Sequence, residues 1–385
     1  MRPRSGIAPH VNLLLTCSGD ASGASVSIAA STDWSRFCAL VEHHGMGPHV
    51  DDVLAHSDEI PTDVRRRLRE LHADASSYSL LLAARLVQLV IAFEQAGIPV
   101  VSLKGPALSQ QLYGDPGRRD SLDIDLLVPV ARIEDAVAVL RANGYQLESE
   151  LDWMGVRQLA ARRSDLTFRS ESGTGVDLHW AVSPADYPST IPESRLWSSL
   201  TSVPIAGRQV PVLSSECLLV YLCIHGTRHC WTKLRWLSDV SMLLARNPEI
   251  DWKTVDAIAS ESRASRALAL GLALAHDLLG ATLPRHVLER IDDDVALRSF
   301  TRELAERLRS PDPAPQPTAV ARTLFNARLA PSRWLGVRHA AALLKAPTDA
   351  DAEFVRLPRA LILLYYPFRA VRLVFKYGRV LVAGH

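Results

Sequence analysis

A seven-residue run that begins at Leu122 constrains the fold of this chain more than any other segment. It reads Leu-Asp-Ile-Asp-Leu-Leu-Val and is closed by a proline. Alternate side chains of a strand share one face, so Asp123 and Asp125 should point the same way. Leu122, Ile124 and Leu126 should then point into a core. The run therefore predicts a half-buried strand that carries two neighbouring carboxylates.

The segments around this strand predict a compact core of strands and helices. Residues 98–103 are apolar and rich in β-branched side chains, which is typical of a strand. Gly105 and Pro106 follow and open a short helix, because proline fits the first helical position. A further helix is expected over residues 133–142, and further strands over residues 166–170 and 176–181.

Helical patterns flank this core on both sides. Apolar residues recur at helical spacing over residues 33–54, 62–95 and 214–279. We therefore expect four parts: an N-terminal helical region over residues 1–96, the α/β core over residues 97–213, a C-terminal helical domain over residues 214–345 and a basic tail over residues 346–385.

The charge balance argues against one class of protein. The chain has 43 Lys and Arg residues against 42 Asp and Glu residues, a net charge of +1. A dedicated duplex-DNA binder needs a basic surface instead. Six basic residues and no acidic one nevertheless lie between Arg356 and the C-terminus. This tail predicts an amphipathic helix that either packs on the body or contacts a membrane surface or a nucleic-acid phosphate.

The sequence favours a cytoplasmic protein without a transmembrane segment. The five cysteines are odd in number and irregularly spaced, which is typical of reduced thiols. The apolar run over residues 11–17 is interrupted by Asn12, and no small-residue cleavage site follows at once, so we expect no signal peptide. No uninterrupted stretch of about 18 apolar residues is present.

The paired aspartates need a positive partner. Carboxylates about 7 Å apart along a strand repel each other, and Mg²⁺ is commonly held by one or two carboxylates plus substrate phosphates. Asp177 lies in the alternating run Val-Asp-Leu-His-Trp and adds a third carboxylate on a neighbouring strand. Lys104 and the helix that starts after Gly105 offer positive charge to a phosphate. The alternative is a strand end with solvated acids.

This order of elements resembles the nucleotidyltransferase superfamily that includes DNA polymerase β. Five segments are similar to a family of uncharacterised bacterial nucleotidyltransferases: the run from Val101 to Leu108, residues 112–115 together with Arg119, the run from Asp123 to Val128, the run from Tyr221 to Asp239, and the opening helical region with residues 33–34 and 43–45. The resemblance spans most of the chain. It implies an α+β fold in which a small mixed sheet with flanking helices lies between N-terminal and C-terminal helical regions.

The resemblance also implies a reaction. Asp123 and Asp125 would hold two Mg²⁺ ions, or Mn²⁺ in their place, and Asp177 would be a third metal ligand or the base. An acceptor hydroxyl would attack the α-phosphorus of an NTP such as ATP and release pyrophosphate. A small molecule, a peptide or a protein is the expected acceptor.

Nucleotide contacts are implied at Lys104, Gly105, Arg119 and Lys233. The superfamily usually has Gly-Ser or Gly-Gly where this chain has Gly105 and Pro106. A serine that would touch a phosphate is therefore missing, and we hypothesise that Lys104 takes its place. Arg119 lies in a turn-rich loop, where a surface arginine is the alternative interpretation.

Two other functions remain open at this stage. One is a toxin-like transferase that acts on RNA such as a tRNA 3′ end, which the basic tail keeps possible without favouring it. The other is a non-catalytic nucleotide-binding scaffold. All three acidic positions, Asp123, Asp125 and Asp177, are filled, which counts against a scaffold.

A second cluster lies in the C-terminal helical domain. His225 and His229 are four residues apart on one helix face. This spacing can bind zinc, but the glutamate of HExxH and a third ligand are missing. Arg228, Lys233 and Arg235 either pack structurally or face the nucleotide across a cleft.

Overall fold

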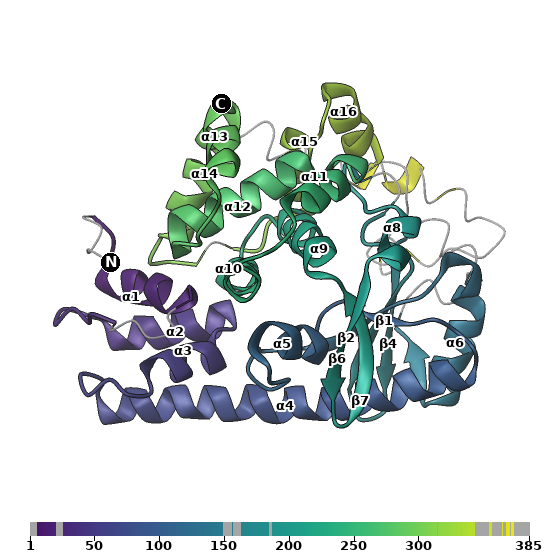
Figure 1. The fold of residues 1–385 in the computed structure, drawn as a ribbon, viewed down its shortest axis with the longest axis horizontal. Helices are drawn as coiled ribbons and strands as arrows, with labels where there is room; N and C mark the ends of the chain where they lie inside the picture. The colour runs from purple at the N-terminus through teal and green to yellow at the C-terminus, as the bar shows by residue number, and fades with distance from the viewer. Residues whose placement is uncertain are drawn as a thin grey trace.

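The predicted small mixed sheet is present, and the run of paired aspartates forms its second strand (Figure 1). The computed structural model describes residues 6–20, 26–148, 156, 163–184, 187–313 and 315–342, with 354–355, 364, 367–369 and 371–372. Five strands pair in the order β1-β2-β5-β4-β3. They are β1 (Val101–Ser102), β2 (Asp123–Leu127), β3 (Tyr145–Leu147), β4 (Asp165–Ser170) and β5 (Gly175–His179). Strands β2 and β5 are parallel and the other pairs antiparallel, which confirms the α+β fold.

The register of β2 against β5 sets the position of the acids. Asp125 is paired with Asp177, and Leu127 with His179. Ile124 and Leu126 are fully buried, as the alternation predicts. The prediction for Leu122 is wrong: this side chain is 60% exposed, because it precedes the first strand residue, Asp123, and lies outside the sheet.

Two predicted helices pack close to the sheet, and the bounds of the second match the prediction. Helix α5 (Pro106–Tyr113) begins directly after Gly105, and α6 (Ile133–Ala142) follows the 3₁₀ helix η1 (Val130–Arg132). Strand β1 is shorter than expected, since only two residues of the apolar run pair with β2. Strand β1 therefore adds little pairing to the sheet and leads directly into the segment that contains Gly105.

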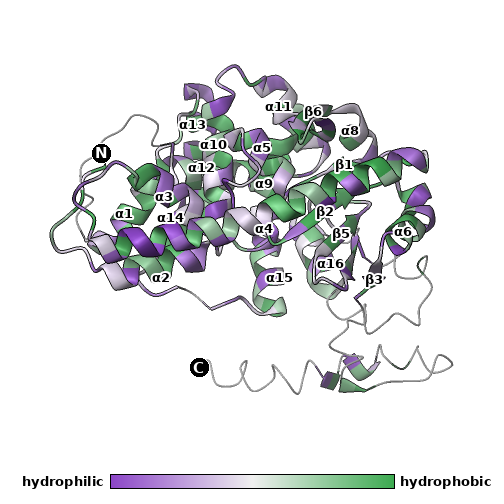
Figure 2. Cartoon of the chain, turned by 90° about the horizontal axis from the view of Figure 1, so that it is seen from below, coloured by the Kyte–Doolittle hydropathy of each residue, from purple (hydrophilic) through white to green (hydrophobic). Residues whose placement is uncertain are grey.

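Helix α4 (Thr62–Gln95) runs beneath the whole molecule and joins its two cores (Figure 1). Val64 and Leu68 in its first half belong to the core of the helical regions, whereas Leu86 and Phe93 in its second half belong to the sheet core. Figure 2 shows the first half mostly hydrophilic and the second half more hydrophobic. By length and composition alone, α4 is one helix in the described part of the chain that could cross a membrane.

The N-terminal helices and all but the last of the C-terminal helices share one hydrophobic core. The N-terminal ones are α1 (Pro9–Ser18), α2 (Trp34–His44) and α3 (Gly47–Leu54). The C-terminal ones are α9 (Ser215–Arg228), α10 (Leu234–Arg246), α11 (Trp252–Glu261), α12 (Ser265–Leu279), α13 (Arg285–Asp293), α14 (Val295–Leu308), α15 (Ala319–Arg328) and α16 (Arg333–Ala342). The single helix predicted over residues 33–54 is broken at Gly45, whose φ of +66° ends α2. The apolar run near the N-terminus forms the largely buried helix α1.

A hairpin and a short helix lie where the sequence predicted only a proline-rich stretch. The helix is α8 (Glu193–Ser198), and the hairpin strands are β6 (Leu200–Ile205) and β7 (Arg208–Leu213). Ala206 and Gly207 form the turn, both with positive φ. Val210 and Val212 point into the sheet core. The sequence did not predict this hairpin, because proline ordinarily argues against a strand.

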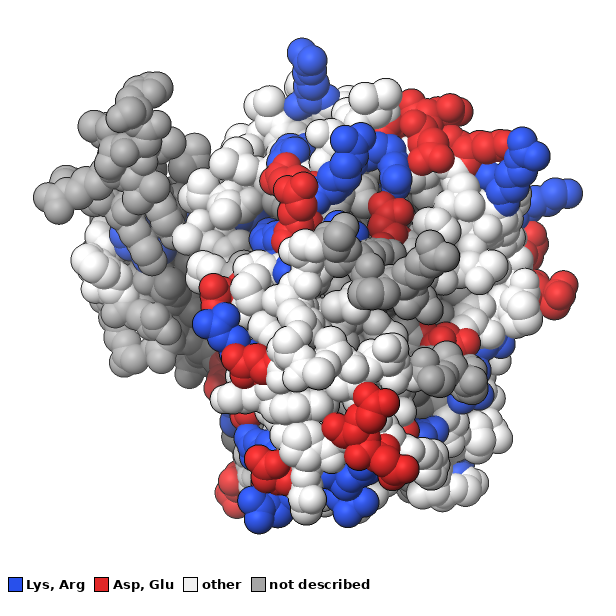
Figure 3. All heavy atoms as spheres, turned by 90° about the vertical axis from the view of Figure 1, so that its left-hand side faces the viewer, with Lys and Arg blue, Asp and Glu red and all other residues white. Residues whose placement is uncertain are grey.

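The surface carries both signs of charge. Figure 3 shows Lys and Arg side chains interspersed with Asp and Glu side chains at the end of the molecule that holds the N-terminal helices. Arg67 with Glu42 and Arg118 with Asp52 are examples of the resulting ion pairs. The five cysteines are free thiols. Most of the predicted basic tail lies outside the described residues.

Candidate active site

A cavity of about 260 Å³ lies where the sheet meets α9 and α10. One wall comes from strands and the loops before them, and contains Lys104, Gly105, Asp123, Asp125, Asp177 and His179. The other wall comes from the helices, and contains Tyr221, His225, Arg228, His229, Arg235 and Trp236. All three predicted acids therefore face one space, opposite a wall of rings and arginines.

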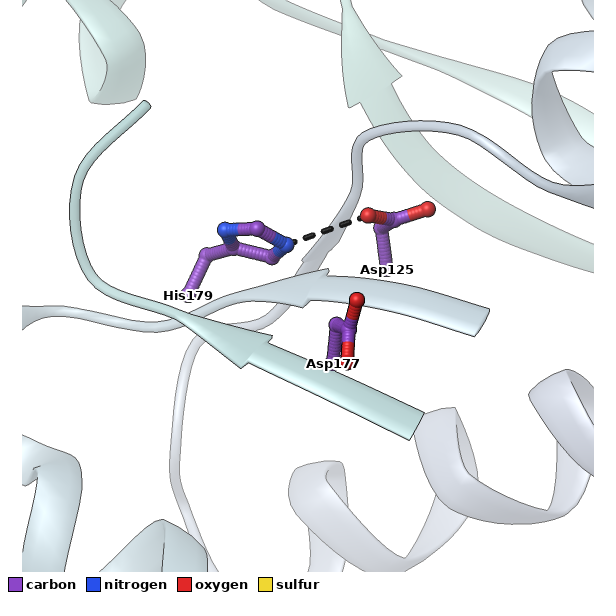
Figure 4. Close-up of side chains that lie close together, drawn as sticks. All are labelled: Asp125, Asp177 and His179. Carbon is purple, nitrogen blue, oxygen red and sulfur yellow. Dashed lines mark hydrogen bonds and ion pairs between the residues drawn. The ribbon is translucent and has the colours of Figure 1, made fainter. Parts of the chain in front are cut away.

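Asp125 is the most buried acid of the cavity. Its side chain is 1% exposed, and Oδ1 lies 2.8 Å from Lys104 Nζ. The same oxygen lies 3.1 Å from His179 Nε2 (Figure 4). Burial alone would raise the pKa of Asp125, but the Lys104 charge and the hydrogen bond from His179 hold it well below its usual range. Its other oxygen, Oδ2, is buried without a hydrogen-bond partner in the described part of the protein. Asp125 is therefore a charged ligand with one oxygen still uncommitted.

The pKa values of Asp123 and Asp177 are shifted in the opposite direction from that of Asp125. Burial and the nearby Asp125 charge raise the pKa of Asp123 to about 6. The same two causes raise the pKa of Asp177, whose Oδ1 accepts a hydrogen bond of 2.8 Å from Thr167 Oγ1. Additional positive charge beside these acids would favour the ionised form of each carboxyl group.

These residues fit a divalent cation. Ligand atoms of Asp125, Asp177 and His179 all lie within 4.8 Å of one another (Figure 4). The uncommitted Asp125 Oδ2 supplies an acceptor that protein groups leave unused. Carboxylate oxygens suit Mg²⁺ and Mn²⁺, and an imidazole adds a ligand that transition metals accept.

His179 belongs to this group, although the sequence analysis did not assign it a role. It lies two residues after Asp177 on β5, so both side chains share one face of the sheet. Burial would lower the pKa of His179, but its hydrogen bond to Asp125 and the charge of Asp165 raise it. The alternation that placed Asp177 on this face also applies to His179 and is the signal that could have found it.

Lys104 and Gly105 shape the floor of the cavity. Burial would lower the pKa of Lys104, but the Asp125 carboxylate outweighs burial and raises it. Lys104 is therefore a stable counter-charge for Asp125, where the sequence suggested a phosphate contact. Gly105 has a φ of +66°, and a Cβ there would lie 2.8 Å from the backbone oxygen of Asp123. Only glycine brings the α5 N-terminus this close to β2 without strain.

Arg119 and Lys233 are placed differently from Arg235. Arg119 lines the cavity, but its Nε and Nη2 donate to Asp239 over 2.7 and 2.9 Å. Lys233 contacts the backbone oxygen of His43 and is absent from the cavity lining. Arg235, two residues later, does line it. Arg235 Nε is buried without a hydrogen-bond partner in the described part of the chain, and Nη1 lies 3.5 Å from Asp120 Oδ2.

The small mixed sheet and the three aspartates that face one cavity together define a class of enzyme. A family model described as "Uncharacterised nucleotidyltransferase" matches residues 30–280, a range that contains every residue of the cavity. The chain belongs to this family, and nucleotidyl transfer is its activity.

Two solved structures are similar to parts of the chain. One is the solution structure of the antibiotic-resistance factor ANT(2'')-Ia, with 19% identity over 50% of this chain and 96% of that chain, at a TM-score of 0.32. The other is the crystal structure of an antigenic nucleotidyltransferase-like protein from Paracoccidioides brasiliensis, with 17% identity over 56% of this chain and 97% of that chain, at a TM-score of 0.33. No curated protein matches.

Proposed function

We propose that this protein transfers a nucleoside monophosphate from an NTP to a hydroxyl group of an acceptor, with a divalent cation bound at Asp123, Asp125 and Asp177. One observation carries the proposal: these acids and His179 face one cavity, and the buried Asp125 Oδ2 has no hydrogen-bond partner among the described residues. When bound, Mg²⁺ or Mn²⁺ supplies Lewis acidity to the phosphates and acidifies the acceptor hydroxyl.

The side chains divide the remaining work. Asp177 accepts the proton of the acceptor hydroxyl at Oδ2, because Thr167 already donates to Oδ1. Its raised pKa makes Asp177 a better proton acceptor than an ordinary carboxylate. The acceptor oxygen then forms a bond to the α-phosphorus as the bond to the β-phosphate oxygen breaks, and pyrophosphate leaves with that electron pair. Arg235 binds the phosphates, since its Nε has no protein partner in the described chain.

Lys104 and His179 act on Asp125 rather than on the substrate. Both lie within 3.1 Å of Asp125 Oδ1, so they keep this carboxylate ionised and fixed in orientation. The uncommitted Oδ2 is thereby directed to the cation. Pre-orientation of this kind is how a buried site lowers an activation barrier without rearrangement during the reaction.

Transfer of label tests the proposal. Protein is incubated with each α-³²P-labelled NTP, Mg²⁺ and one of three acceptors: small molecules and proteins of a cell extract, purified tRNA, or the protein itself. We expect label in a non-RNA acceptor, and loss of at least about 1000-fold in Asp123→Asn and Asp125→Asn, in line with the removal of a charge that acts in the transition state.

Asp58→Asn is the matched control, because Asp58 is an exposed acid remote from the cavity lining. Chelation of the metal should abolish transfer, and added Mg²⁺ or Mn²⁺ should restore it. Equal labelling by wild type and both site variants would refute the catalytic role of the acids. Label confined to tRNA would replace the proposed acceptor class by RNA.

A further inference from the structure

Three aromatic rings from the helical wall meet in the cavity and have no part in the reaction described so far. His225 and His229 lie one turn apart on α9, with ring centroids 4.6 Å apart. Trp236 lies at the start of α10, and its ring centroid is 5.5 Å from that of His225 and 5.2 Å from that of His229. We call these three residues the ring wall.

The ring wall is not explained by packing alone. All three side chains line the cavity opposite the acids. Both histidines are half-buried, and neither imidazole forms a side-chain hydrogen bond within the described residues. Two buried histidines near the cavity do find partners: His44 Nδ1 accepts from the backbone N–H of Leu234, and His179 Nε2 contacts Asp125. The uncommitted nitrogens of His225 and His229 instead face a space that a ligand can fill.

The ring wall is uncharged. Burial, together with the nearby charge of Lys104, lowers the pKa of His225 well below its ordinary value. Burial and Arg228 lower the pKa of His229 to about 3. Each neutral imidazole therefore offers one N–H donor and one acceptor nitrogen, on flat rings that carry no charge. The ring wall is a poor match for a metal ion. In the described part of the chain, the residues whose ligand atoms lie close enough together to hold one are Asp125, Asp177 and His179.

We propose that the ring wall of His225, His229 and Trp236 is the binding site for the nucleobase of the NTP. This inference rests on the proposed function. The cavity has three chemical zones, and an NTP has three matching parts: the acids with their cation match the reacting phosphate, Arg235 matches the remaining phosphates, and the neutral rings match the base. Bases stack on aromatic side chains whatever their identity, while the imidazole nitrogens can form hydrogen bonds with a base edge.

Binding measurements with and without a base test this assignment. The affinity of wild type and Trp236→Leu is measured by calorimetry in Mg²⁺ for ATP, GTP, CTP and UTP, and for inorganic tripolyphosphate, which has the phosphates but no base. We expect Trp236→Leu to weaken the binding of at least one NTP by about 10- to 100-fold, the range for loss of one stacked base. Its affinity for tripolyphosphate should not change. Trp236→Phe, which keeps a ring, should retain most of the NTP affinity.

Two further variants keep the test independent of folding. Trp252→Leu is the matched control, because Trp252 lies on α11 against His286, away from the cavity lining; its NTP affinity should equal that of wild type. His229→Asn probes the ring wall with a smaller change and should weaken NTP but not tripolyphosphate. Thermal unfolding of each variant confirms that it is folded.

The outcomes separate this inference from the proposed function. If wild type transfers label but binds NTPs no more tightly than tripolyphosphate, the base site is refuted and the proposed function stands. Equal weakening of NTP and tripolyphosphate by Trp236→Leu and His229→Asn would make the ring wall structural and would also refute the base site. If wild type binds no nucleotide and transfers no label, the proposed function fails with it.

Discussion

The two walls of the cavity are built in different ways. The strand wall takes its acids from β2 and β5, whose register alone places Asp125 beside Asp177. The helical wall takes its rings and arginines from α9 and α10, and contacts between segments far apart in sequence hold it in place. Arg119 and Asp239, 120 positions apart, form one of these contacts. The reactive carboxylates are thus fixed by local geometry, whereas the helical wall depends on how the whole chain packs.

The walls also differ in charge. The strand wall carries three acids: burial and the Asp125 charge raise the pKa values of Asp123 and Asp177, whereas Lys104 and the hydrogen bond from His179 lower the pKa of Asp125. The helical wall carries uncharged rings flanked by arginines. In the proposed function, the strand wall supplies the groups that react and the helical wall supplies the groups that bind the substrate. Each contact that holds the two walls in place can be tested by substitution.

The largest effect is expected from the ion pair that ties the two walls together. Asp239→Asn removes a 1% exposed carboxylate that receives two hydrogen bonds from Arg119, itself 8% exposed. The buried guanidinium loses its counter-charge, so we expect the free energy of unfolding to fall by about 3–5 kcal/mol. Denaturant unfolding monitored by tryptophan fluorescence measures the loss.

A double variant distinguishes charge from packing. Arg119→Met with Asp239→Leu replaces the pair by apolar side chains and should recover most of the lost stability, because no unpaired charge stays buried. If the double variant is as unstable as Asp239→Asn, the pair contributes through shape alone, and the two walls are not joined by electrostatics.

Lys104→Met should lower the free energy of unfolding by about 3 kcal/mol, but only in the absence of a divalent cation. Lys104 Nζ lies 2.8 Å from the buried Asp125 Oδ1, so its removal leaves that carboxylate with His179 as its main positive neighbour. A divalent cation at Asp125 supplies the missing charge. We therefore expect the rise in melting temperature on addition of Mg²⁺ to be larger for Lys104→Met than for wild type.

The control for this experiment is Lys253→Met, which alters an exposed lysine on α11. It should leave both the melting temperature and its response to Mg²⁺ unchanged. An identical response to Mg²⁺ in Lys104→Met and wild type would show that Asp125 is not a metal ligand.

Most of the strand wall could be predicted from the sequence, because period-two alternation is a local property. It predicted that Asp123 and Asp125 share a face, and the Gly105-Pro106 pair predicted the start of the short helix α5. Their catalytic and metal-binding roles stay predictions. The alternation failed at Leu122, since it does not show where a strand begins.

The helical wall could not be predicted to the same depth. Lys233 and Arg235 are two residues apart, and the one that enters the cavity depends on α10 beginning at Leu234. Arg119 looked like a free cation, because its partner Asp239 lies 120 positions away. Pairings of this kind come from tertiary packing, on which a single sequence carries little information.

Gly105→Ala tests the contact that brings α5 to the strand wall. Alanine would have to adopt a φ of +66° and place its Cβ 2.8 Å from the backbone oxygen of Asp123. We expect about 2 kcal/mol of destabilisation from backbone strain, and a loss of transfer activity because β2 must shift to relieve the contact.

Gly97→Ala separates strain from contact, since Gly97 has a φ of +62° but no atom within 4 Å of the position that a Cβ would occupy. It should destabilise the protein without reducing transfer. Equal loss of activity in both variants would mean that Gly105 matters only for its backbone conformation.

The smallest effect is expected from pH, at the junction between the helical wall and the N-terminal helices. His44 Nδ1 accepts a hydrogen bond of 3.3 Å from the backbone N–H of Leu234, the first residue of α10. Burial, and then the nearby His43 and Lys233, lower the pKa of His44 to about 3. A histidine of the unfolded chain has a pKa of about 6.5 and begins to take up a proton near that pH. His44 in the folded protein is still neutral there.

The sign of the pH effect follows from this difference. Stability from neutral His44 is fully present above about pH 6.5 and is lost as the pH falls toward 3, because the unfolded chain binds a proton that the folded chain excludes. When the pH falls from about 7 to about 5.5, His44 should lower the free energy of unfolding of wild type by about 1 kcal/mol. His44→Gln removes the titration, so its stability should fall less over the same interval, as measured by urea unfolding at both pH values. If wild type and His44→Gln lose equal stability, His44 does not hold α10 against α2, and the helical wall depends on contacts that do not titrate.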